Sequence, residues 1–206
     1  MLLDRISSPK DLKKLSFEEL EQLGSEIRWY IIEIISSRGG HLASSLGCVE
    51  ITLALHYVFD APRDKILWDV GHQSYAHKII TGRREQFRDI RTKSGISGFP
   101  NISESEYDTY GVGHASTAIS AALGLSVARD ISGEENFIVT VVGDGTLTGG
   151  LAFEGINQAG HLKKNRFIIV LNDNEMSISK NVGALSRYLT KITTQKLYLQ
   201  LEADVW

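Results

Sequence analysis

The chain has 206 residues, enough for one large domain or two small ones, and 42% of them are hydrophobic, so a buried core can form. The formal net charge is -3 and the lysines and arginines are scattered, so we expect no nucleic-acid partner. The single cysteine excludes a disulfide within the chain. The sequence shows neither a secretory signal nor an apolar run of the ~18 residues that a membrane span needs, which predicts a cytoplasmic chain without membrane contact.

Two helices are predicted in the first third of the chain. Ser16 and Glu19 have the spacing of a capping box, and apolar residues follow at helical period until the glycine pair at 39–40. A second helix is predicted at about residues 45–59, because apolar residues again recur near helical spacing and Pro62 lies just beyond them.

The pattern then changes to short apolar runs that are rich in β-branched residues. KILW at 65–68, FIVTVV at 137–142 and RFIIVL at 166–171 each end in polar loop residues and predict buried strands. Helical stretches at 115–130 and 148–164 separate these runs. The alternation predicts an α/β fold with a doubly wound, mostly parallel sheet flanked by helices, in which ligands bind beyond the carboxyl ends of the strands.

A long loop is predicted at 92–109, where the chain is rich in glycine, serine and acidic residues. It lies between the first and second predicted strands. Two interpretations stay open, a solvated surface loop and a mobile lid over a binding site.

Asp144 follows the second predicted strand within the sequence GDGTLT, residues 143–148. Glycines beside an acid suggest close approach of the backbone to a phosphate, yet a bare carboxylate repels phosphate. A dinucleotide motif fits poorly because its third glycine would stand at Thr148, and an aspartyl phosphatase would need its nucleophile at Val142. A magnesium ion between the acid and a diphosphate resolves the conflict.

Asn174 would supply a second oxygen ligand for such an ion. It closes the triplet NDN after the third predicted strand, and adjacent parallel strands would bring it to Asp144 although 29 residues lie between them. The helix that begins at Thr148 would direct its N-terminus toward the same phosphates. The alternative that Asp144 caps a helix and Asn174 lies in a turn stays open.

Three histidines, His41, His72 and His114, each follow a glycine in a predicted loop, as residues presented to a binding site do. His56 and His77 lie within predicted helices instead. The three loop histidines could also bind zinc, although they lack the spacing of ligands on one helix and no cluster of thiolates accompanies them.

Several stretches of the sequence resemble a known family. GDG, followed after 28 residues by the asparagine that closes NDN, is similar to the thiamine-diphosphate motif of transketolase-like enzymes. The stretches GGHLASSLG, WDVGHQSYAHKIITGR, SGISGFPNISESEYDTYGVGHASTAIS and NDNEMSISKNVGAL narrow the resemblance to the 1-deoxy-D-xylulose-5-phosphate synthase family. The resemblance covers essentially the whole chain, and transketolase itself is the alternative.

The resemblance implies the thiamine-diphosphate-binding fold and a set of site residues. Magnesium would be bound by Asp144, Asn174 and the backbone carbonyl of Met176. The cofactor would contact Asn174 and a further set of positions, namely His72, Gly113, His114, Ala115, Gly145 and Thr146. His41 would handle the substrate and, together with His72, would transfer protons.

The implied reaction joins pyruvate, with loss of carbon dioxide, to glyceraldehyde 3-phosphate, and serves isoprenoid, thiamine and pyridoxal synthesis. The family also needs a glutamate from a pyrimidine-binding domain that this sequence does not contain. We therefore expect residues 1–206 to be a single diphosphate-binding domain, incomplete at its C-terminal end, of a homodimeric enzyme that works with the missing domains or a complementary chain. The alternatives are a noncatalytic cofactor-binding fragment and a partly unfolded relic with an exposed sheet edge.

Overall fold

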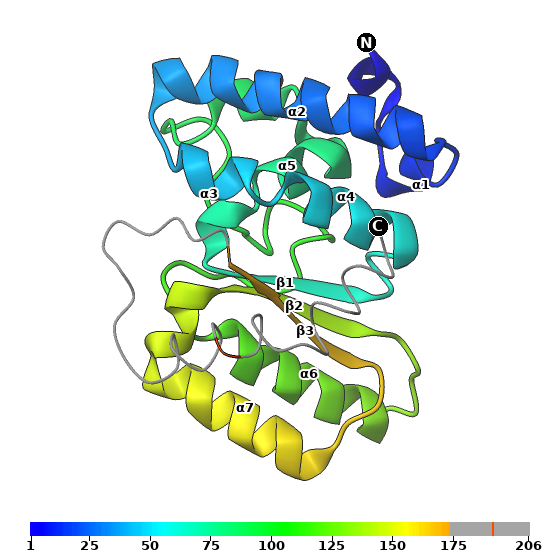
Figure 1. The fold of residues 1–206 in the computed structure, drawn as a ribbon, viewed down its shortest axis with the longest axis vertical. Helices are drawn as coiled ribbons and strands as arrows, with labels where there is room; N and C mark the ends of the chain where they lie inside the picture. Colours follow the sequence, from blue (N-terminus) through cyan, green and yellow to red (C-terminus); the bar gives the residue numbers. More distant parts are fainter. Residues whose placement is uncertain (174–190, 192–206) are drawn as a thin grey trace. The chain divides into compact units, whose positions relative to one another are not determined.

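The computed structural model describes residues 1–173 and Lys191, and the chain divides into two compact units, residues 1–174 and 175–206. In the first unit a parallel sheet lies between two layers of helices (Figure 1). This arrangement confirms the predicted α/β fold with a parallel sheet flanked by helices. Among the helices of the described part, none has the length and apolar character needed to cross a bilayer.

Among the described residues, three strands form the sheet in the order β1-β2-β3, and each neighbouring pair is parallel. They are β1 (Lys65–Asp69), β2 (Ile138–Gly143) and β3 (Phe167–Asn172). Each boundary lies within one residue of its prediction, because buried β-branched runs bounded by polar residues define strand ends clearly. The register pairs Asp69 with Val142 and Gly143 with Asn172, so the carboxyl ends of the three strands lie level.

Helices cover both faces of the sheet (Figure 1). The crossover helices α6 (Ala118–Ile131) and α7 (Gly150–Leu162) lie on one face. On the other side lie α3 (Leu42–Leu46), α4 (Val49–Val58) and α5 (Tyr75–Lys78), with α1 (Pro9–Leu12) and α2 (Phe17–Arg38) outside them. Short turns of helix join these elements: η1 (Leu2–Arg5), η2 (Gly71–Gln73), η3 (Ile79–Arg83), η4 (Gln86–Asp89) and η5 (Asp144–Thr148).

The core follows from the alternation of side chains along the strands. On β1, Ile66 and Trp68 pack with Leu55 of α4, whereas Leu67 between them packs with Ala118 and Ala122 of α6. Each fully buried aliphatic side chain of this kind contributes roughly 1.5–3 kcal/mol. The sheet is therefore held between the two helical layers by apolar contacts on both faces.

The predicted capping box starts α2. The Glu19 N–H donates to Ser16 Oγ at 3.2 Å, and the Ser16 N–H donates to Glu19 Oε2 at 3.0 Å. The apolar side of this helix is fully buried at Leu23, Ile27 and Ile31. The prediction of this helix is confirmed, and Gly39, with φ of 74°, ends it.

The prediction of one continuous helix over residues 45–59 is wrong. Two helices, α3 and α4, occupy this region, and the chain breaks between them at Gly47 and Cys48. Glycine weakens a helix at this point, and the flanking side chains bond elsewhere: Ser45 Oγ donates to the carbonyl of His72 and Cys48 Sγ to Gln73 Oε1. Tertiary contacts have therefore replaced a continuous helix.

The segment 92–109 is a loop, as predicted, and two acidic side chains anchor it. Glu104 accepts a hydrogen bond from Lys78 Nζ at 2.6 Å, and Asp108 accepts one from His77 Nε2 at 2.9 Å. Asp108 is only 3% exposed. The loop is therefore attached to α5 rather than freely solvated.

Candidate functional site

Asp144 lies at the carboxyl end of the sheet, because it follows β2 directly and begins η5. On the neighbouring strand, Asn172 is the register partner of Gly143, and Asn174 comes two residues later in the sequence. Asn174 and Met176 lie outside the described residues, so their pairing with Asp144 stays a prediction. The level ends of β2 and β3 are the geometry on which that prediction depends.

Two stretches predicted to contact the cofactor meet at this edge. The side chain of Ser116, next to the stretch 113–115, donates to the carbonyl of Thr146 at 2.8 Å. Gly113, His114, Ala115 and Gly145 are exposed, whereas Thr146 is buried. The exposed backbone of both stretches is therefore available to a ligand at the carboxyl end of the sheet.

Asp69, the last residue of β1, is a site residue that the sequence reasoning missed. Its fully buried carboxylate accepts hydrogen bonds from the backbone N–H groups of Ser116 and Ala118, both at 2.9 Å. Its carbonyl accepts from Gln73 Nε2 at 2.8 Å and from Thr146 Oγ1 at 3.4 Å. Asp69 thus fixes η2, η5 and the loop before α6 together. Its position directly after the predicted strand at 65–68, like that of Asp144 after its own predicted run, was the available signal.

Burial raises the pKa of Asp69, and the backbone N–H donors oppose that shift. Because each carboxylate oxygen accepts a hydrogen bond from the backbone before α6, the role of Asp69 is to position the loops. α6 begins at Ala118 rather than at 115 because Ser116 has a positive φ of 74°, which a right-handed helix cannot contain.

The three loop histidines converge, although they are far apart in the sequence. The ring centroids of His41 and His72 lie 4.4 Å apart in a stacked arrangement. The His114 ring lies 5.7 Å from that of His41 and 5.4 Å from that of His72. His56 and His77, by contrast, are buried in α4 and α5 and bond to each other at 2.9 Å.

The environment of the cluster favours neutral imidazoles. Burial, followed by the nearby His41 and His114, lowers the pKa of His72 to about 4. Burial also lowers the pKa of His41, with Arg91 and His114 adding to the effect. His41 and His72 are therefore uncharged near neutral pH.

Backbone contacts fix the loops that carry the histidines. The Gly71 N–H donates to the carbonyl of Gly113 at 3.1 Å, which joins the loop of His72 to that of His114. A Cβ at Gly71 would stand 2.6 Å from the carbonyl oxygen of Val112, so this approach requires glycine. The two loops are thus in direct backbone contact.

Cys48 lies beneath this region as a structural residue. Asn172 Nδ2 donates to Cys48 Sγ at 3.0 Å, and the thiol donates to Gln73 Oε1 at 2.9 Å. Burial raises the pKa of the thiol to about 12, so it stays protonated and is not a nucleophile near neutral pH. The three side chains connect α4, η2 and the end of β3.

Comparison with solved structures supports the fold. The chain is similar to transketolase from Leishmania mexicana, with a TM-score of 0.69 and 17% sequence identity. The match covers 83% of this chain and 30% of that chain. At this identity the likeness defines the class of fold alone, a transketolase-like α/β domain.

Sequence comparison identifies the family. Residues 3–206 match the family model described as 1-deoxy-D-xylulose-5-phosphate synthase. The synthase from Carboxydothermus hydrogenoformans is 61% identical over 197 residues, and that from Syntrophomonas wolfei is 56% identical over 204 residues. These alignments cover 96% and 99% of this chain. The chain belongs to the 1-deoxy-D-xylulose-5-phosphate synthase family.

The alignments also show the extent of the match. Each covers 32% of the relative's length, so the chain spans about a third of the curated relatives that it matches. The family match confirms the resemblance seen in the sequence and favours it over the transketolase alternative.

Proposed function

We propose that residues 1–206 form the part of a 1-deoxy-D-xylulose-5-phosphate synthase that binds magnesium and the diphosphate of thiamine diphosphate. The whole enzyme would condense pyruvate, with decarboxylation, and glyceraldehyde 3-phosphate, as a cytoplasmic homodimer. The remaining domains, or a complementary chain, would supply the pyrimidine-binding half of the site. Family membership over nearly the whole chain supports this proposal.

The observation that carries the proposal is the level alignment of the ends of β2 and β3. It brings Asp144 to the same edge at which the chain continues to Asn174. A carboxylate and an amide are the hard oxygen donors that magnesium prefers, so the donor set fits the ion. Asp144, Asn174 and the carbonyl of Met176 would hold the metal, and Gly145 and Thr146 would contact the diphosphate.

The histidine cluster fits the remainder of the cofactor. The buried Nδ1 atoms of His41 and His72 have no hydrogen-bond partner among the described residues. Such atoms can bond to a polar ligand at little desolvation cost. When bound, thiamine diphosphate supplies a carbon nucleophile and an electron sink. His72, with Gly113, His114 and Ala115, would orient the ring system, and His41 and His72 would hold or move protons beside the substrate.

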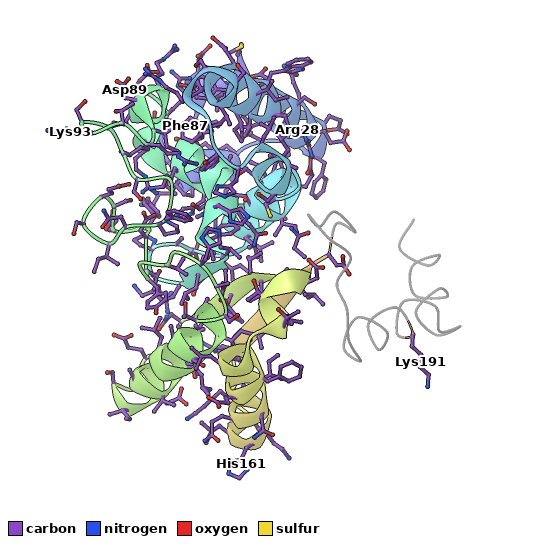
Figure 2. All side chains as sticks on the ribbon, turned by 90° about the vertical axis from the view of Figure 1, so that its left-hand side faces the viewer. Arg28, Phe87, Asp89, Lys93, His161 and Lys191 are labelled. Carbon is purple, nitrogen blue, oxygen red and sulfur yellow. The ribbon has the colours of Figure 1, made fainter. Side chains whose placement is uncertain are left out.

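A thermal melt of the purified chain tests the binding proposal. Thiamine diphosphate with magnesium should raise the midpoint, because a ligand that binds only the folded state stabilises it. Asp144→Asn should abolish this rise while leaving the melt of the free chain cooperative. Asp89→Asn serves as the control, because Asp89 lies on the surface far from the sheet and should leave the rise unchanged (Figure 2). A rise that does not need magnesium, or that survives Asp144→Asn, would refute the proposed metal site.

A second measurement separates binding from catalysis. Carbon dioxide release from pyruvate should be absent with the chain alone and should appear after a separately expressed remainder of the enzyme is added. Turnover by the chain alone would contradict the proposed division of the site. Binding without release in either sample would favour the noncatalytic alternative.

A further inference from the structure

We propose that His41, His72 and His114 form a binding site for a divalent transition-metal ion of the zinc class, separate from the proposed magnesium site at Asp144. Imidazole nitrogen suits zinc, cobalt, nickel and copper, whereas magnesium prefers oxygen ligands. The two sites therefore differ in ligand chemistry and share no ligand.

The geometry of the three rings carries the proposal. Each histidine offers one ring nitrogen, and these three nitrogens all lie within 4.8 Å of one another. Two nitrogens bound to one tetrahedral zinc ion at about 2.05 Å stand roughly 3.4 Å apart. Rotations of the side chains that also turn the stacked rings of His41 and His72 out of parallel would bring the three nitrogens to a common ion. Within the described residues, no other group of three or more histidine, cysteine or acidic side chains brings its ligand atoms this close together.

Two of the three histidines have a ring nitrogen without a hydrogen-bond partner in the part of the chain that the structure describes. The buried Nδ1 atoms of His41 and His72 have no hydrogen-bond partner among the described residues. A buried nitrogen without a partner is costly, and coordination to a metal would remove that cost. His114 is exposed, so an ion can reach the cluster from solvent.

The three side chains come from elements that are fixed against one another. His41 is the N-cap residue of α3, and its N–H donates to the Tyr75 hydroxyl at 3.4 Å. The carbonyl of His72 accepts a hydrogen bond from Ser45 Oγ at 2.6 Å. The backbone at His41 and His72 is therefore already held before an ion binds, and only the rings remain to be ordered.

An aromatic side chain lies against the cluster. The Phe99 ring centroid lies 5.5 Å from that of His114 and 6.4 Å from that of His41. Three histidines leave a fourth coordination position for water or another small ligand, as in zinc sites with three protein ligands. Phe99 would shield one side of this position from solvent.

The relation of this metal to thiamine diphosphate rests on the proposed function. Two of the three ligands, His72 and His114, are also proposed cofactor contacts. Metal and cofactor would therefore exclude each other, and a zinc-loaded chain would not take up the cofactor.

Titration of the purified chain with Co²⁺, in an excess of Mg²⁺ and without cofactor, tests the site. One equivalent should give the visible absorption of a tetrahedral or five-coordinate ion, and Zn²⁺ should displace it. His114→Ala should weaken Co²⁺ binding by at least about tenfold, which is ~1.4 kcal/mol. A melt of this variant without metal verifies that it folds, and the exposure of His114 makes this the safest ligand to remove.

Two control variants test whether Co²⁺ binds at the histidine cluster. His161→Ala removes an exposed histidine at the far end of α7 and should leave Co²⁺ binding unchanged (Figure 2). Asp144→Asn should also leave it unchanged. Equal Co²⁺ binding by His114→Ala and the parent chain, or loss of binding in either control, would overturn the proposal. None of these outcomes bears on the proposed magnesium site, because that site is tested separately by the thermal melt with thiamine diphosphate and magnesium.

Discussion

At the scale of single residues, Asp108 shows how a buried charge holds a loop. Arg83 donates to both of its oxygens at 2.7 Å, and the Asn101 N–H donates to it at 2.8 Å. Burial alone would raise the pKa of Asp108, but the hydrogen bonds from His77 and Arg83 outweigh it and hold the pKa well below its usual range. The carboxylate is thus charged and paired inside the protein.

Asp108→Asn should therefore be strongly destabilising. The change would leave the buried Arg83 guanidinium with only its longer ion pair to Glu104, at 3.6 Å, a loss of about 3–5 kcal/mol. Urea unfolding followed by far-UV circular dichroism measures it. Asp89→Asn breaks the exposed pair of Asp89 with Arg38 and should cost less than about 1 kcal/mol. Equal effects of the two substitutions would show that Asp108 is not held as a buried ion.

At the scale of elements, the crossing of α6 and α7 depends on one glycine. A Cβ at Gly155 would stand 2.9 Å from both Ile119 Cγ2 and Ser120 Oγ, and 3.2 Å from the backbone nitrogen of Ser120. Real side chains seldom approach so closely, so the absence of a side chain sets the distance between the two helices.

Gly155→Ala should destabilise the chain by about 1–3 kcal/mol, because the helices must separate to admit the methyl group. Gly160 is the matched control, since it lies on the same helix and its Cβ would meet no atom within 4 Å. Gly160→Ala should be neutral or should stabilise by up to about 1 kcal/mol through the helix propensity of alanine. Thermal or urea unfolding of both variants compares them directly, and a harmless Gly155→Ala would contradict the close crossing.

The elements that could be predicted from the sequence are those with a local cause. Neighbouring residues alone determine the capping box of Ser16 and Glu19. The same holds for the β-branched runs before GDG and NDN, which form strands. The break at Gly47 could not be predicted, because the side chains beside it bond to residues far away in the sequence. The start of α6 could not be predicted, because it depends on the positive φ of Ser116. Asp69 was missed because its hydrogen bonds join segments that are far apart in the sequence.

The site was predicted in part. The location of Asp144 at a strand end is confirmed, whereas the ligand roles of Asp144, Asn174 and Met176 stay predictions. The loop histidines were selected because each follows a glycine, yet nothing in their spacing showed that they meet. Contacts between loops so far apart in sequence follow from the sheet and its crossovers, which only the folded chain displays.

At the scale of the whole molecule, buried histidines make stability depend on pH. Burial lowers the pKa of His56 well below its usual value and also lowers that of His77. His77 faces Asp108, Arg83 and Lys78, and His56 faces His77, Arg83 and Lys13. A group whose pKa is lower in the folded state binds protons more readily after unfolding. Their contribution to stability is full above the unfolded pKa of about 6.5 and is lost as the pH falls below it.

The free energy of unfolding should therefore fall by on the order of 1–3 kcal/mol between about pH 7.5 and about pH 5.5. His56→Gln should flatten this dependence, because one titrating group is removed from the core. His161→Gln, at an exposed position, should leave the slope as it was. Urea titrations at several pH values measure how the free energy of unfolding changes with pH. A free energy of unfolding that rises on acidification would contradict the prediction.

The pairing of Gly143 with Asn172 fixes how far the chain after β3 extends relative to Asp144, which follows β2. A parallel strand advances about 3.3 Å per residue, whereas a magnesium–oxygen bond measures only about 2.1 Å. A slip of β3 by one position would displace the chain beyond Asn172 by more than a full bond length. Interior substitutions at strand positions such as Thr140 and Ile169, partners in this register, can therefore impair chelation without touching a ligand.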